Sequence, residues 1–162
     1  MSIRMILRNF WKLAAAIAVC EAAGIIGALV TAPAVASWYP TLVHPSYAPP
    51  PFVFGPVWTA LYALMGVAAF LVWRKGFAHA GVKTALGLFA VQLALNVLWS
   101  VLFFGLRSPA AALAEIVVLW AAIAYTMHAF ARVSRAAAWL LAPYLAWVSF
   151  AALLTYGFWS LN

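Results

Sequence analysis

Five long apolar runs, separated by short segments that carry almost all of the charge, are the feature that most constrains this chain. A helix needs about 20 mostly apolar residues to cross the hydrocarbon core of a bilayer, whereas a soluble domain carries about 25% charged residues. Here 69% of the 162 residues are apolar and 7% are charged, and Glu21 and Glu115 are the only carboxylate side chains. The chain is therefore expected to be an integral membrane protein with lipid as its main solvent.

The segments between the charged residues predict an all-α bundle of five transmembrane helices, forming a single domain over residues 1–162. The predicted helices cover residues 11–32, 52–73, 83–104, 109–131 and 137–160. We expect the first helix to end near Pro33 and to be an uncleaved membrane helix, because its apolar run exceeds the roughly 7–15 residues of a signal-peptide core. The fourth should begin at Pro109, and Pro143 should kink the fifth.

The positions of the basic residues predict how the chain crosses the membrane. Eight of the nine lie in the N-terminal segment, between helices 2 and 3, or between helices 4 and 5: Arg4, Arg8, Lys12, Arg74, Lys75, Lys83, Arg132 and Arg135. The opposite side has Arg107 alone. We therefore expect the N-terminus inside and the C-terminus outside. Because the basic residues form small groups at helix ends rather than one basic stripe, no nucleic-acid partner is expected.

The loop expected between helices 1 and 2, residues 33–51, is unusual in composition. Its residues 34–51 contain five prolines, three aromatic residues and no Lys, Arg, Asp or Glu. A flexible linker would be polar and rich in Gly and Ser. The composition favours a semi-rigid lid over the helix bundle, and the alternative is an interfacial aromatic belt with a turn.

Polar and aromatic residues are predicted to share the outer half of the bundle. At 1.5 Å per residue, Trp58, Trp99 and Glu115 each lie roughly 9 Å from the outer end of their helix, and Asn96 lies one turn deeper than Trp99. Trp147 should lie deeper still. Since these three tryptophans are not at helix ends, they are candidates for a set that faces a ligand.

Each of these residues also has a structural interpretation. Asn96 and Gln92 share one helix face and could simply hydrogen-bond neighbouring helices. Glu21 and Glu115 could pack in the interior, although carboxylates within membranes tend to line cavities. The remaining helix-end tryptophans are most simply interfacial: Trp11, Trp73, Trp139 and Trp159.

Several kinds of chemistry lack a signal in the sequence. His44, His79 and His128 are spread over the lid, one loop and the inner end of helix 4, so neither a metal site nor two-histidine haem ligation is expected. Hydrolase and phosphate-binding motifs are absent from the sequence. No tightly bound cofactor is predicted, and a conventional enzyme is disfavoured. Small-residue pairs such as Ala23 and Gly27 would permit a homodimer.

The chain resembles the translocator protein family, also called tryptophan-rich sensory proteins or the peripheral benzodiazepine receptor. The resemblance covers nearly the whole chain. The matching segments are WY at 38–39, HPSY at 44–47, PPPFVFGPVWTALYALMG at 49–66, QLALNVLW at 92–99, FFG at 103–105 and PYLAW at 143–147.

This resemblance implies a five-helix bundle, usually dimeric, with a pocket under the lid that binds porphyrins, sterols and synthetic aromatic ligands. The positions that match the family's pocket are Trp58, Asn96, Trp99, Trp147 and Ala151, with Tyr39 as a nearby loop aromatic and Tyr62 as a further candidate within the hallmark segment. Trp58 and Trp147 also match two tryptophans implicated in light-dependent porphyrin breakdown.

Two departures from the family pattern qualify that implication. Tyr47 stands where the family often has a second loop tryptophan. The C-terminal sterol motif needs an aromatic followed by Lys or Arg, and residues 156–162 contain no basic residue. Sterol binding is therefore not expected.

The expected function is a membrane receptor or carrier for a tetrapyrrole, such as protoporphyrin IX or haem, or for another hydrophobic aromatic molecule. The tetrapyrrole would be a ligand rather than a resident cofactor. Two alternatives remain open: a light-dependent porphyrin-degrading enzyme and a regulatory membrane adaptor. The membrane would be that of a bacterial cell envelope or, in a eukaryote, the mitochondrial outer membrane.

Overall fold

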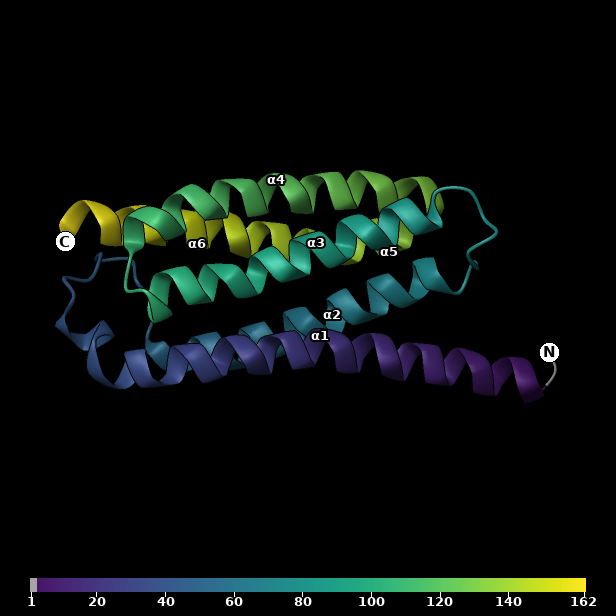
Figure 1. Cartoon of the computed structure of the whole chain (residues 1–162), viewed down its shortest axis with the longest axis horizontal. Helices are drawn as coiled ribbons and strands as arrows, with labels where there is room; N and C mark the ends of the chain where they lie inside the picture. Colours follow the sequence, from purple (N-terminus) through teal and green to yellow (C-terminus); the bar gives the residue numbers. More distant parts are fainter. Residues whose placement is uncertain (1–2) are drawn as a thin grey trace.

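The computed structural model describes residues 3–162, and every regular element within them is a helix (Figure 1). Five stretches are long and apolar enough to span a membrane. They are Ile3–Ser37, Pro51–Trp73, Val82–Gly105, Pro109–Val133 and Arg135–Leu161. Large apolar side chains such as Ile25, Leu29 and Val117 are 60–71% exposed on the bundle surface, which suits contact with lipid. The predicted all-α, five-helix membrane bundle is confirmed.

The elements follow one another in a simple antiparallel order (Figure 1). They are α1 (Ile3–Ser37), the short helices η1 (Tyr39–Thr41) and η2 (Pro51–Val53), α2 (Phe54–Trp73), α3 (Val82–Ser100), the π-helical turn η3 (Val101–Gly105), α4 (Pro109–Val133), α5 (Arg135–Leu140) and α6 (Ala142–Leu161). The α1–α2 loop and the C-terminus lie at one end of the bundle, called the outer end below. The N-terminus and the α2–α3 loop lie at the other, inner end.

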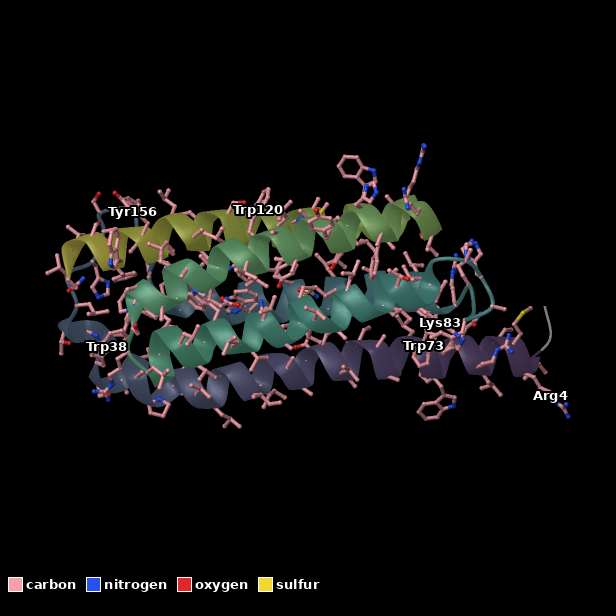
Figure 2. The ribbon with its side chains drawn as sticks, turned by 45° about the horizontal axis from the view of Figure 1, so that its top comes forward. Arg4, Trp38, Trp73, Lys83, Trp120 and Tyr156 are labelled. Atoms are coloured by element: carbon pink, nitrogen blue, oxygen red, sulfur yellow. The ribbon has the colours of Figure 1, made fainter. Side chains whose placement is uncertain are left out.

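Labelled basic side chains lie at one end of the bundle, whereas aromatic side chains lie at both ends. Figure 2 shows Arg4 and Lys83 at the inner end and Trp38 and Tyr156 at the outer end. Near the inner end, the Lys12 ammonium lies 5.2 Å from the centre of the Trp73 ring. Basic residues other than Arg107 thus lie at or near the end of the bundle that holds the N-terminus.

The first helix is longer than the sequence indicated. α1 continues through Pro33 to Ser37, so the prediction that it ends near Pro33 is wrong. A proline in a helix removes one hydrogen bond, and the last turn here gains two others: the Ser37 hydroxyl donates to the Pro33 carbonyl at 2.7 Å, and the Trp38 N–H donates to the Ala34 carbonyl at 2.9 Å. The loop is correspondingly shorter than the expected 33–51.

The fifth span is two helices rather than one kinked helix. The break falls at Leu141, between α5 and α6, and Pro143 lies in the first turn of α6. At that position the missing N–H would have no partner within the helix in any case. A kink was predicted at Pro143, and the structure instead has a new helix that begins just before it.

The backbones of α1 and α2 approach each other closely at Ile17 and Gly66. A Cβ atom added to Gly66 would lie 2.6 Å from the Ile17 Cα atom, and one added to Gly24 would lie 2.6 Å from the Tyr62 ring. Gly27 faces Ser100 of α3. Ala23 and Gly27 are both buried, so this pair packs inside the bundle and offers no free face for a second copy.

The Gly66 contact generates a stability prediction. Gly66→Ala should lower the free energy of unfolding by about 1–3 kcal/mol, because the added methyl group forces α1 away from α2. Thermal unfolding in detergent, followed by circular dichroism, measures this. Gly87→Ala in α3 is the matched control, since nothing lies within 4 Å of its Cβ position. An equal effect of the two substitutions would contradict the close-contact interpretation.

Candidate functional site

A cavity of about 580 Å³ lies in the outer half of the bundle. Residues from α1, α2, α3, η3, α4 and α6 line its walls, and Tyr39 and Pro51 of the lid segment line its outer end. Along α1 the lining runs from Glu21 to Ala36, a distance of about 22 Å at 1.5 Å per residue. Its size lies within the roughly 300–1,000 Å³ of small-molecule sites.

All seven residues proposed from the sequence as ligand-binding line this one cavity. They are Tyr39, Trp58, Tyr62, Asn96, Trp99, Trp147 and Ala151. Glu115, which was expected to share this region, is buried but does not line the cavity, and both of its oxygens lack a hydrogen-bond partner within residues 3–162. The structure thus brings together the aromatic set and separates Glu115 from it.

The inner end of the cavity carries a chain of hydrogen bonds between three helices. The Tyr62 hydroxyl donates to Asn96 Oδ1 at 2.5 Å, and Asn96 Nδ2 donates to the Tyr144 hydroxyl at 3.0 Å. The Tyr144 hydroxyl in turn donates to Gln92 Oε1 at 2.8 Å. The proposed packing role of Gln92 and Asn96 is therefore real, and Asn96 combines it with a place in the cavity wall.

Glu21 also lines the inner end of the cavity, and no partner for it could be identified from the sequence. It lies one turn before Gly24, whose Cα packs against the Tyr62 ring. Within residues 3–162 it forms neither an ion pair nor a side-chain hydrogen bond, whereas Tyr62 and Asn96 are bonded to each other. Glu21 is therefore a lining carboxylate without a side-chain partner among the described residues.

Aromatic rings close the outer end. Trp99 and Phe103 stack with ring centres 5.1 Å apart, and Tyr39 packs against Phe158 at 5.3 Å and His44 at 4.6 Å. Tyr39 is 6% exposed, and burial raises the pKa of its phenol above the usual value. The π-helical turn η3 supplies Phe103 and Phe104 to the cavity wall, and such turns are frequent at functional sites.

The lid loop is fastened to the end of α6. Asn162 Oδ1 accepts a hydrogen bond from the Val43 N–H at 2.9 Å, and Asn162 Nδ2 donates to the Val43 carbonyl at 3.1 Å. The Tyr47 hydroxyl donates to the Leu153 carbonyl at 3.2 Å. Asn162 was not among the residues singled out from the sequence, because a single terminal asparagine carries no recognisable pattern.

One side of the cavity opens between α1 and α2. The lining residues that are exposed lie on facing stripes of these two helices: Ile25, Ala28, Ala32 and Ala36 on α1, and Gly55 and Thr59 on α2. Below them the Gly66 contact brings the two backbones together. The cavity is thus closed at its inner end and open to the side of the bundle.

Comparisons with known proteins agree with this architecture. The model of the TspO/MBR family matches residues 16–160. This chain belongs to the TspO/MBR family. It is 50% identical over 156 residues to the tryptophan-rich protein TspO of Chlorobaculum tepidum, covering 96% of this chain and 98% of that protein. It is 45% identical over 127 residues to the human translocator protein, covering 77% of this chain and 75% of that protein.

A third relative is similar over most of its length. The tryptophan-rich sensory protein of Cereibacter sphaeroides is 39% identical over 146 residues, covering 90% of this chain and 88% of that protein. The resemblance inferred from the motifs is thereby confirmed. Membership of the TspO/MBR family and the five apolar helices establish this chain as a multi-pass integral membrane protein.

The Asn162 contact generates a prediction about the lid. Asn162→Ala removes both hydrogen bonds to Val43, each worth about 0.5–1.5 kcal/mol, so the Val43 amide should exchange with deuterium about tenfold faster. Mass-spectrometric hydrogen exchange on protein in detergent measures this. Ser160→Ala is the control, because its hydroxyl bonds only to the Gly157 carbonyl of its own helix. Unchanged exchange in Asn162→Ala would show that the lid is held by its aromatic contacts alone.

Proposed function

We propose that this protein is a membrane receptor or carrier that holds a tetrapyrrole, such as protoporphyrin IX or haem, or another flat aromatic molecule. The observation that supports this most directly is the convergence of Trp58, Trp99 and Trp147, from three helices, on one cavity of about 580 Å³. The printed names of the relatives, a tryptophan-rich sensory protein and a translocator protein, fit a receptor or carrier role.

The physical basis of binding would be burial of a flat ring system against aromatic walls. Each well-placed aromatic pair adds about 0.5–1.5 kcal/mol beyond the burial of apolar area. Trp58 already lies against Tyr62, with ring centres 5.5 Å apart, and Trp147 against Phe54 at 6.0 Å. These rings are held by packing, so little side-chain entropy is lost when a ligand enters.

The side opening between α1 and α2 supports entry from the membrane. A hydrophobic ligand concentrates in lipid, and the exposed lining residues at the opening are small or apolar. The lid, fastened by Asn162 and Tyr47, covers the outer end. A homodimer remains a proposal that rests on the family resemblance, since the Ala23–Gly27 pair is used inside the bundle.

A second candidate function is light-dependent breakdown of a bound porphyrin. Trp58 and Trp147 both line the cavity, so both would lie beside an excited porphyrin. The excited tetrapyrrole and oxygen would supply the chemistry, and the tryptophans would quench it or react. A regulatory adaptor role has less support, because no observation on the bundle surface identifies a partner.

Titration with protoporphyrin IX in the dark tests the binding proposal. We expect saturable quenching of tryptophan fluorescence in detergent-purified protein and at least tenfold weaker binding in Trp58→Ala, because a stacking wall is lost. Trp159→Ala is the matched control, since Trp159 is 49% exposed and lies outside the cavity lining. Asn96→Ala is a poorer test, because it also removes the hydrogen-bond partner of the Tyr62 hydroxyl and the bond that Asn96 donates to Tyr144. Non-saturable quenching would reject the tetrapyrrole proposal.

Illumination of the same samples separates a binder from a degrader. Protein-dependent loss of porphyrin absorbance that disappears in Trp58→Phe and Trp147→Phe, but persists in Trp159→Phe, would favour the degrading enzyme. Saturable binding with a rate of bleaching equal to that of free porphyrin would favour the receptor.

The orientation is a separate proposal. We expect the N-terminus inside and the C-terminus outside, because the basic side chains gather at the end of the bundle that holds the N-terminus. A C-terminal reporter that is active only outside the cytoplasm should be active when fused to this chain in a bacterial host. A reporter active in the cytoplasm would reverse the assignment.

A further inference from the structure

The inner end of the cavity has an acidic side chain and, among the described residues, no basic one. Glu21 is the one carboxylate that lines it, and no Lys, Arg or His of residues 3–162 does so. The two polar side chains beside Glu21 are already engaged, since Tyr62 donates to Asn96 and Asn96 donates to Tyr144. Asn96 is also 4% exposed, so little of it is open to a ligand. The two Glu21 oxygens are thus the free hydrogen-bond acceptors beside Tyr62, whereas the unpartnered indole N–H groups of Trp99 and Trp147, which also line the cavity, are themselves buried.

The position of Glu21 makes it accessible from inside the cavity. It is partly buried, whereas Cys20, its neighbour in α1, is completely buried. The helix contact at Ile17 and Gly66 closes the bundle one turn below it. A molecule that enters between α1 and α2 and fills the cavity to its inner end must therefore meet the Glu21 side chain.

We infer that Glu21 selects the ligand: it favours molecules whose inner edge carries a hydrogen-bond-donating or cationic nitrogen, and it rejects a carboxylate there. This rests on the proposed function, because it assigns the chemistry of the same cavity. A carboxylate accepts hydrogen bonds, and charge-assisted bonds of this type are roughly twice as strong as neutral ones. A second anion beside it would be repelled, and no basic side chain among the lining residues would compensate.

Repulsion from Glu21 would also determine the direction in which a carboxylated porphyrin binds. Its propionates would avoid Glu21 and lie toward the outer end or the opening between α1 and α2, where water and lipid headgroups are within reach. The edge of the macrocycle that carries no propionate would lie at the inner end, beside Tyr62. Asn96 would then be a wall residue rather than an anchor for a propionate.

Three matched probes test this inference: 1-pyrenemethylamine, 1-pyrenemethanol and 1-pyrenecarboxylic acid. They share one flat ring system and differ in a single small group that is cationic, neutral or anionic near neutral pH. Energy transfer from tryptophan to pyrene reports binding to the full chain in a non-ionic detergent. We expect the wild type to bind the amine at least tenfold more tightly than the acid, with the alcohol between them.

Glu21→Gln keeps the size of the side chain and removes its charge, so it should reduce the preference for the amine over the acid to about twofold or less. Its affinity for the alcohol should stay within about twofold of the wild type, which also shows that the cavity remains folded. Glu115→Gln is the matched control, because Glu115 is the other carboxylate of the chain and does not line the cavity. It should keep the wild-type preference.

The possible results separate this inference from the proposed function. A wild type that binds amine and acid equally, or a Glu21→Gln variant that keeps the full preference, overturns the role of Glu21 while leaving the cavity as an aromatic binding site. A loss of preference in Glu115→Gln as large as that in Glu21→Gln also overturns it. Absence of saturable binding for all three probes, including the alcohol, overturns the proposed function and this inference with it.

Discussion

The close approach of α1 and α2 at Gly66 determines the shape of the functional half of this molecule. Because the Cβ position of Gly66 falls 2.6 Å from the Ile17 Cα atom, no larger side chain fits there, and the two backbones meet. Toward the outer end, Gly24 already accommodates the Tyr62 ring, so the helices are held further apart. The cavity begins where this separation begins, with α3, α4 and α6 as its remaining walls. A single contact between two helices thus sets both the floor of the cavity and its side opening.

Polar groups within the bundle follow from the solvent that surrounds it. Lipid cannot satisfy a hydroxyl or an amide, so these groups must bond to one another. The chain from Tyr62 through Asn96 and Tyr144 to Gln92 meets that requirement and joins α2, α3 and α6. Its bonds hold the wall of the cavity in place and at the same time leave little capacity for a ligand. The side chains that these bonds hold in place at the inner end of the cavity are therefore not free to bind a ligand. Glu21 is outside this chain of bonds.

The sequence was sufficient to predict the features that depend on apolar composition and on the position of a residue along its helix. Apolar length gave the five spans, and depth along each helix placed Trp58, Trp99 and Trp147 in one region. Contacts between distant residues could not be read in this way. Pro33 suggested a helix end because the bonds of Ser37 and Trp38 that sustain the last turn were not visible. Glu21 and Glu115 could not be distinguished from the sequence. Whether either one lines the cavity depends on the rotation of its helix about the helix axis, which the sequence does not show.

The two ends of the cavity impose different requirements on whatever occupies it. At the outer end, Tyr39 is packed against Phe158 and His44, so selection there depends on shape and apolar area, which discriminate weakly between flat molecules. At the inner end, a single carboxylate faces a space without a basic side chain among its lining residues. A site that hydrogen-bonds a specific group rejects molecules lacking it far more strongly than an apolar wall does. On the proposed function, specificity in this cavity would therefore depend on Glu21, whereas affinity would depend on the aromatic walls.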